Sequence, residues 1–139
     1  MNLFINSPAY FTAEYGVIDE IYKMTYYFME NINVAKYTDV LDTIGIVPII
    51  APSHILMDGA WKERKYISIP YRMADISLRA DFESYYNGNI DRKREIMFEN
   101  ILDCMKVIKR RLKGKFDYQQ LEEDLTLLYR KLIEENELG

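Results

Sequence analysis

The sequence has 139 residues, of which 49% are hydrophobic and 29% charged, and its formal net charge is −4. The length fits a single domain spanning residues 1–139, and the composition excludes a disordered chain. No uncharged apolar run reaches about 18 residues, so we expect no membrane span. The first residues do not resemble a secretory signal, and Cys104 is the only cysteine, so no intrachain disulfide can form. We therefore expect a cytoplasmic protein.

The charges fall into three blocks along the chain. Residues 1–61 hold two Lys/Arg and seven Asp/Glu, residues 62–116 hold fourteen and eight, and residues 117–139 hold two and seven. The blocks therefore carry −5, +6 and −5. Such blocks either pack against one another or present a charged face to a partner.

The first third predicts a strand, a helix and a proline-containing extended segment. Residues 2–6 have the composition of a short strand, and apolar residues recur at helical spacing over 17–32. The run 46–51 is apolar around Pro48. Since proline cannot donate a hydrogen bond to a sheet, this run predicts an edge strand or a buried extended segment.

Alternating side chains predict two further strands. In residues 66–72 the apolar positions are Ile67, Ile69 and Tyr71, and in residues 73–82 every second residue is again apolar, ending at Phe82. Period two with one polar face predicts antiparallel strands covered on one side.

Two helices complete the chain. Asn89 is the expected N-cap of a helix over 90–113, and Gly114 its expected C-terminal stop. Asp117 and Gln120 predict a capping box at the start of the last helix. The predicted order is β-α-β-β-β-α-α: an α+β fold with a small antiparallel sheet and helices packed on one face.

The sequence predicts no catalytic, metal or cofactor site, and we expect that the protein is not an enzyme. His54 is the only histidine, and one histidine with one cysteine cannot form a zinc site. Cys104 lies among apolar residues of a predicted helix, and we interpret it as a small buried side chain. A pocket near residues 52–61, which Trp61 and Tyr66 could line, leaves an enzyme or a small-ligand sensor as an open alternative.

Nucleic-acid binding is the second alternative. It would use a cluster at the basic end of the 90–113 helix: Lys106, Lys109, Arg110, Arg111, Lys113 and Lys115. Cations at a helix C-terminus already have a structural explanation, and the acidic sequence, with a pI of about 5.1, weakens attraction to a polyanion. Nucleic acid is therefore the less favoured partner.

A protein-binding surface is the favoured interpretation. Six of the twelve tyrosines lie in the acidic first block. Tyrosines supply contact area at interfaces, and carboxylates attract a basic partner. We predict that eight residues of this block contact the partner: Glu14, Asp19, Glu20, Tyr26, Tyr27, Glu30, Asp39 and Asp42.

Three segments resemble a bacterial immunity-protein family of polymorphic toxin systems, the one numbered forty-four. They are residues 7–17 (SPAYFTAEYGV), 41–52 (LDTIGIVPIIAP) and 114–118 (GKFDY). The resemblance implies a cytoplasmic inhibitor, of the contact-dependent inhibition type, that masks the active site of a cognate toxin. Many such toxins are nucleases with basic grooves, which an acidic face would complement.

Overall fold

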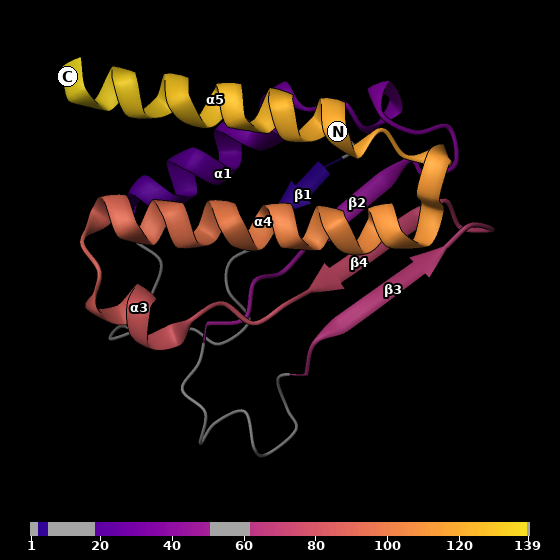
Figure 1. Ribbon diagram of the computed structural model, residues 1–139, viewed down its shortest axis with the longest axis horizontal. Helices are drawn as coiled ribbons and strands as arrows, with labels where there is room; N and C mark the ends of the chain where they lie inside the picture. The colour runs from indigo at the N-terminus through magenta and orange to yellow at the C-terminus, as the bar shows by residue number, and fades with distance from the viewer. Residues whose placement is uncertain (1–2, 6–18, 51–61, 139) are drawn as a thin grey trace.

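The computed structural model describes residues 3–5, 19–50 and 62–138 (Figure 1). In chain order the elements are β1 (Leu3–Ile5), α1 (Asp19–Asn31), the 3-10 turn η1 (Val34–Lys36), β2 (Thr43–Ile46), β3 (Arg64–Ser68), β4 (Met73–Ser77), α3 (Phe82–Asn87), α4 (Ile90–Leu112), the 3-10 turn η2 (Lys113–Lys115) and α5 (Tyr118–Leu138). The predicted α+β class and element order are confirmed, with α3 as an added short helix. Within the described ranges, no helix is both long and apolar enough to cross a membrane.

The sheet is mixed, so the prediction of an antiparallel sheet was wrong for most of it. The strand order is β1-β2-β4-β3; β1 and β4 both pair parallel to β2, and only β3 and β4 are antiparallel. Alternation of apolar and polar residues indicates which face of a strand is buried, but it does not indicate whether the neighbouring strand runs parallel or antiparallel. The long connection through α1 permits the parallel crossover from β1 to β2.

Helices cover one face of the sheet, as predicted. Strand register aligns the inward side chains in two rows, all buried: Leu3, Ile44 and Ala74, then Ile5, Ile46 and Ile76. α1 packs on β1, α4 on β4, and α5 on both helices (Figure 1). On the opposite face Phe4 is 42% and Tyr66 40% exposed.

The segment around Pro48 is not an edge strand. β2 begins and ends before Pro48, at Thr43–Ile46, and occupies a central position between β1 and β4. Beyond its end the amides of Val47 and Ile49 still donate to carbonyls of β4 and its continuation, both at 3.1 Å. Sheet-like bonding therefore continues on either side of Pro48, whose missing N–H would fall between the two bonds.

The strands predicted over 66–72 and 73–82 are shorter than expected. β3 ends at Ser68, and the chain turns through Tyr71, which is 77% exposed, and Arg72, which has a φ of 54°. Phe82 begins α3 because the Asp81 carboxylate caps that helix by accepting a hydrogen bond from the Ser84 amide at 3.1 Å. Local turn and cap chemistry thus ended the apparent alternation.

The helix starts follow the prediction more closely than the helix ends. Asn89 caps α4, its side-chain oxygen accepting from the Arg92 amide at 2.9 Å. The stop of α4 falls on Lys113, with a φ of 53°, whereas Gly114 does not adopt a left-handed φ. The predicted role of Gly114 as the C-terminal stop was therefore wrong.

Only half of the predicted capping box forms at α5. Asp117 accepts a hydrogen bond from the Gln120 amide at 3.1 Å, as expected of the cap. The Gln120 side chain instead donates to Asp124 at 2.9 Å. The Asp117 amide, which the box would have used, donates to the Tyr37 carbonyl at 2.8 Å. A tertiary contact has taken the place of the local one.

Candidate partner-binding surfaces

The exposed side of α1 carries part of the predicted surface. Tyr26 is 58% exposed, and Glu30 is exposed one turn later. Neither side chain forms a hydrogen bond or an ion pair with another described residue. Tyr27 is half-buried against the core, so it contributes only one edge to this side of the helix.

Three residues of the prediction cannot be placed. Glu14 lies outside the described residues, and the structure describes the backbone of Asp19 and Glu20 at the start of α1 but not their side chains.

Asp39 and Asp42 lie in the turn that leads into β2, against Arg72 of the β3–β4 turn. Arg72 Nε donates to Asp42 Oδ2 at 3.0 Å, and Arg72 Nη2 donates to the Asp39 carbonyl at 2.7 Å. The Asp42 amide donates back to the Arg72 carbonyl at 2.7 Å. The hydrogen bond from Arg72 holds the pKa of Asp42 below its ordinary value. Asp42 therefore joins two turns of the chain. The exposed Asp39 carboxylate forms no ion pair with a described residue, but Arg72 lies near it: the hydrogen bond and charge of Asp42, and more weakly the charge of Asp39, raise the pKa of Arg72.

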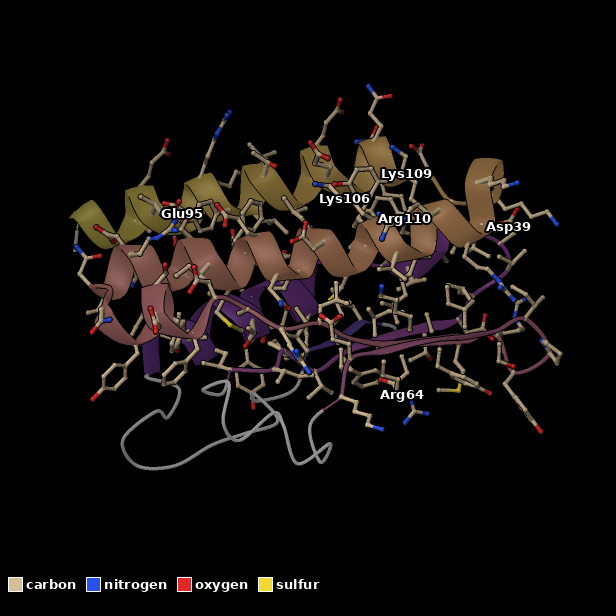
Figure 2. The ribbon with its side chains drawn as sticks, turned by 60° about the horizontal axis from the view of Figure 1, so that its bottom comes forward. Asp39, Arg64, Glu95, Lys106, Lys109 and Arg110 are labelled. Carbon is tan, nitrogen blue, oxygen red and sulfur yellow. The ribbon has the colours of Figure 1, made fainter. Side chains whose placement is uncertain are left out.

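Asp39 lies at the end of the molecule where α4 ends, whereas Glu95 marks the other end of α4 (Figure 2). The turn that holds Asp39 follows α1 by only a few residues, through η1. The C-terminal half of α1, which carries Glu30, and the turn that carries Asp39 are therefore separated only by η1 along the chain. We call these two segments the acidic stretch.

Tyr37, which follows η1 as its C-cap and is one of the six tyrosines in the acidic block, is buried. Its hydroxyl donates to Asp124 Oδ2 of α5 at 2.6 Å. Burial, together with the nearby Asp124 carboxylate, raises the pKa of the phenol. This ring stabilises the fold and is not available to a partner.

The structure also shows an acidic hollow on α5 that was not predicted as a site. Its volume is about 510 Å³, and its described lining consists of Gln120, Glu122, Glu123, Asp124, Thr126, Leu127 and Arg130. The signal was visible in the sequence as three consecutive carboxylates at residues 122–124. On a helix such a run is normally solvated, so it gave no reason to expect a site.

The basic end of α4 divides between two sides of the helix. Lys106 pairs with Asp103 at 3.7 Å, and Lys109 Nζ lies 5.0 Å from the ring centroid of Tyr118 on α5. Both point toward α5 (Figure 2). Arg110 and Arg111 instead line a hollow beside β3. The cluster is therefore partly used in packing and partly free.

The described residues hold no assembled catalytic or metal site. Cys104 is fully buried on α4, and burial raises the pKa of its thiol to about 12. No group of three potential metal ligands occurs in the described part of the chain. His54, Trp61 and the pocket considered at residues 52–61 fall outside the described residues.

Comparison with known proteins gives one match. No curated protein and no solved structure matches the chain. A protein-family model described as immunity protein 44 matches residues 1–131, nearly the whole chain. The resemblance noted in residues 7–17, 41–52 and 114–118 is thereby confirmed, and the chain belongs to the immunity protein 44 family.

Proposed function

We propose that this protein binds a cognate toxin in the cytoplasm and neutralises it by covering the toxin's active site. Membership of the immunity protein 44 family supports the toxin-neutralising role. An inhibitor of this kind acts by binding and needs no catalytic residue of its own.

The observation that carries the proposed surface is the pair Tyr26 and Glu30 on α1. Both side chains are exposed, and neither makes a described contact that the fold requires. An exposed tyrosine gives a large contact area at low entropic cost, and a neighbouring carboxylate accepts charge-assisted hydrogen bonds from a basic partner. Asp39 extends the same acidic stretch beyond η1.

The full proposed contact set keeps the eight residues selected from the sequence, with different roles. Tyr26, Glu30 and Asp39 contact the toxin directly, and Glu14, Asp19 and Glu20 add negative charge at or before the start of α1. Tyr27 supports Tyr26 from its half-buried position. Asp42 acts chiefly through its ion pair with Arg72, which fixes the turn that presents Asp39.

We further propose that the toxin is a nuclease. A nuclease lines its substrate groove with cations that bind phosphates, and a carboxylate-bearing surface complements such a groove. The acidic stretch then competes with nucleic acid for the toxin, so that binding and inhibition are one event.

The test uses a candidate toxin domain chosen from the genes that neighbour this one. The double variant Glu30→Lys/Asp39→Lys should weaken binding to that domain by at least about tenfold and slow association, because each reversal replaces attraction by repulsion. Affinity and association rate are measured by surface plasmon resonance, and cleavage of DNA and RNA by the toxin is followed in parallel with and without the protein.

Glu83→Lys/Glu99→Lys is the matched control. Both residues are exposed on α3 and α4, neither is in an ion pair with a described residue, and the change in net charge is the same. Equal affinity of the two double variants would exclude the proposed surface. Binding without loss of toxin cleavage would exclude masking, and a toxin that cleaves neither nucleic acid would exclude the nuclease.

A further inference from the structure

A basic hollow lies between the edge of the sheet and the C-terminal half of α4. Its volume is about 410 Å³, and its described lining consists of Lys65, Tyr66, Ile67, Val107, Arg110 and Arg111. Lys65 and Ile67 face α4 because they pair with Ile76 and Ala74, whose side chains are buried beneath the helices. The hollow thus has an apolar floor and a cationic rim.

The three cations of the hollow are not neutralised by the described part of the fold. Lys65, Arg110 and Arg111 are exposed, and none forms an ion pair with a described residue. No described residue of the lining is acidic. Like charges that share a hollow repel one another, and an anion bound between them relieves that repulsion.

The hollow runs beside an open strand edge. β3 is the last strand of the sheet and pairs only with β4 among the described strands. Within the described residues, one row of its backbone N–H and C=O groups has no sheet partner, and an added strand could pair with it. Every second side chain of such a strand would point to the α4 side, into the hollow, in register with Lys65 and Ile67.

We propose that this hollow and the β3 edge bind an extended peptide segment that carries carboxylates and an apolar side chain at alternate positions. The carboxylates pair with Lys65, Arg110 and Arg111, the apolar side chain lies on Ile67 and Val107, and the peptide backbone adds a strand to β3. The inference rests on the proposed function in one respect, that the segment belongs to the toxin. The toxin would then contact this protein at two separate places, the acidic stretch and the hollow.

A peptide fits this site better than a nucleic acid. A polynucleotide needs a row of cations along its backbone and stacking surfaces for its bases. Tyr66 is among the residues that line the hollow, but it pairs with Asp75 and so points its exposed ring to the other face of β3. There the Arg64 guanidinium lies 5.3 Å from the ring centroid and pairs with Asp75. Arg64 lies on the side of the sheet away from α4 (Figure 2). The cations of the hollow are therefore not joined to a stacking platform.

The test titrates the whole protein with three probes. They are a short peptide with glutamate, isoleucine and glutamate at alternate positions and threonine between them, the same peptide with lysine for glutamate, and single-stranded oligothymidylate. The acidic peptide should shift the backbone amide NMR signals of residues 65–67 and 107–111, and the lysine peptide should not. Tighter binding of the oligonucleotide at this site would overturn the proposal, as would an acidic peptide that shifts none of these signals.

Arg110→Gln/Arg111→Gln should weaken binding of the acidic peptide by about tenfold or more, because two charge-assisted contacts are lost. Arg130→Gln/Lys131→Gln is the matched control, an adjacent pair of exposed cations on α5, and should change it less than about twofold. An equal loss of peptide affinity in both double variants would mean that net charge alone causes the effect, and would overturn the proposed site. Lys65→Gln tests the same rim without touching the end of α4. Toxin binding by surface plasmon resonance is scored separately, so failure of the peptide site and failure of toxin neutralisation remain distinct results.

Discussion

The hydroxyl of Tyr37 donates a 2.6 Å hydrogen bond to Asp124 across 87 residues of sequence and so joins the end of η1, which Tyr37 caps, to α5. Lys36 Nζ lies 2.8 Å from the same oxygen, Asp124 Oδ2, and Gln120 donates to the other oxygen at 2.9 Å. One carboxylate thus collects three donors and fixes the last helix to the turn that follows α1. The turn holding Asp39 begins at this junction.

Asp124→Asn should destabilise the protein by about 1–3 kcal/mol, because hydrogen bonds to a charged acceptor are lost and the partly buried partners are left less well satisfied. The free energy of unfolding from urea titration measures it. The control is Glu123→Gln, an exposed neighbour in no ion pair with a described residue, which should change stability by less than about 0.5 kcal/mol. Equal effects would mean that the junction carries no stability.

Stability should fall as the pH drops below the ordinary carboxyl value of 3.8. The hydrogen bonds from Lys36, Tyr37 and Gln120 lower the pKa of Asp124, and that from Arg72 lowers the pKa of Asp42. The unfolded chain then binds protons at higher pH than the folded one, so this stabilisation is complete above 3.8 and is lost as pH falls through the lower folded-state values. Urea titrations across this pH range test it. Asp124→Asn should lose less stability on acidification than the wild type, and a parallel loss would contradict the assignment.

How far the sequence predicted this fold depends on the range of the interactions involved. The Asn89 and Asp117 caps were readable because a cap bonds to an amide only three residues away. The mixed sheet was not, because parallel pairing of β1 with β2 depends on contacts between distant segments. The predicted capping box shows the boundary between the two cases. The Asp117 amide donates to the distant Tyr37 carbonyl, and the Gln120 side chain bonds to Asp124 one turn further along α5.

The candidate surfaces divide in the same way. Tyr26 and Tyr27 are adjacent on α1, so helical geometry prevents both rings from facing inward, and the structure leaves Tyr26 exposed and Tyr27 half-buried. No local pattern could reveal that Arg72 would neutralise Asp42, because these residues lie 30 positions apart. The basic hollow likewise combines Lys65 with Arg110 and Arg111 through the packing of α4 beside β3.

Lys113→Gly should stabilise the protein by roughly 0.5–1 kcal/mol. Lys113 has a φ of 53° and a ψ of −126°, a conformation that costs a residue with a Cβ more than it costs glycine. The gain is limited because glycine also has more freedom in the unfolded chain. Thermal unfolding measures it against Lys115→Gly, a neighbouring exposed lysine without a positive φ, which should be neutral or destabilising. A loss of stability at Lys113→Gly equal to that at Lys115→Gly would exclude backbone strain.

The Cys104 thiol should not react with Ellman's reagent in the folded protein at pH 8. The side chain is fully buried on α4 and donates weakly to Asn100 Oδ1 at 3.8 Å. Burial raises its pKa to about 12, so almost no reactive thiolate is present. In guanidinium chloride the single thiol should react completely, which is the control for reagent and protein concentration. Rapid reaction of the native protein would place Cys104 in an accessible or opening part of the molecule.

Separate replacement of Tyr26 and Tyr27 should show that Tyr26 contributes mainly to toxin affinity and Tyr27 mainly to the stability of the fold. Tyr26→Ala removes an exposed ring and should change the free energy of unfolding by less than about 0.5 kcal/mol while weakening toxin binding by about tenfold or more. Tyr27→Ala removes a ring packed against the core and should destabilise the protein by roughly 1–3 kcal/mol with a smaller effect on affinity.

Urea unfolding and surface plasmon resonance with the toxin domain give the two measurements for both variants. Tyr86→Ala on α3 is the control, since its ring is also partly exposed but stacks on Phe82 at 5.7 Å, away from the acidic stretch. It should leave affinity unchanged. If Tyr26→Ala binds the toxin as tightly as the wild type while the protein stays folded, α1 is not the contact helix. The acidic hollow on α5 would then be the next carboxylate-bearing surface to test. Arg130 is the one cation in its described lining, so the hollow would attract a cationic groove.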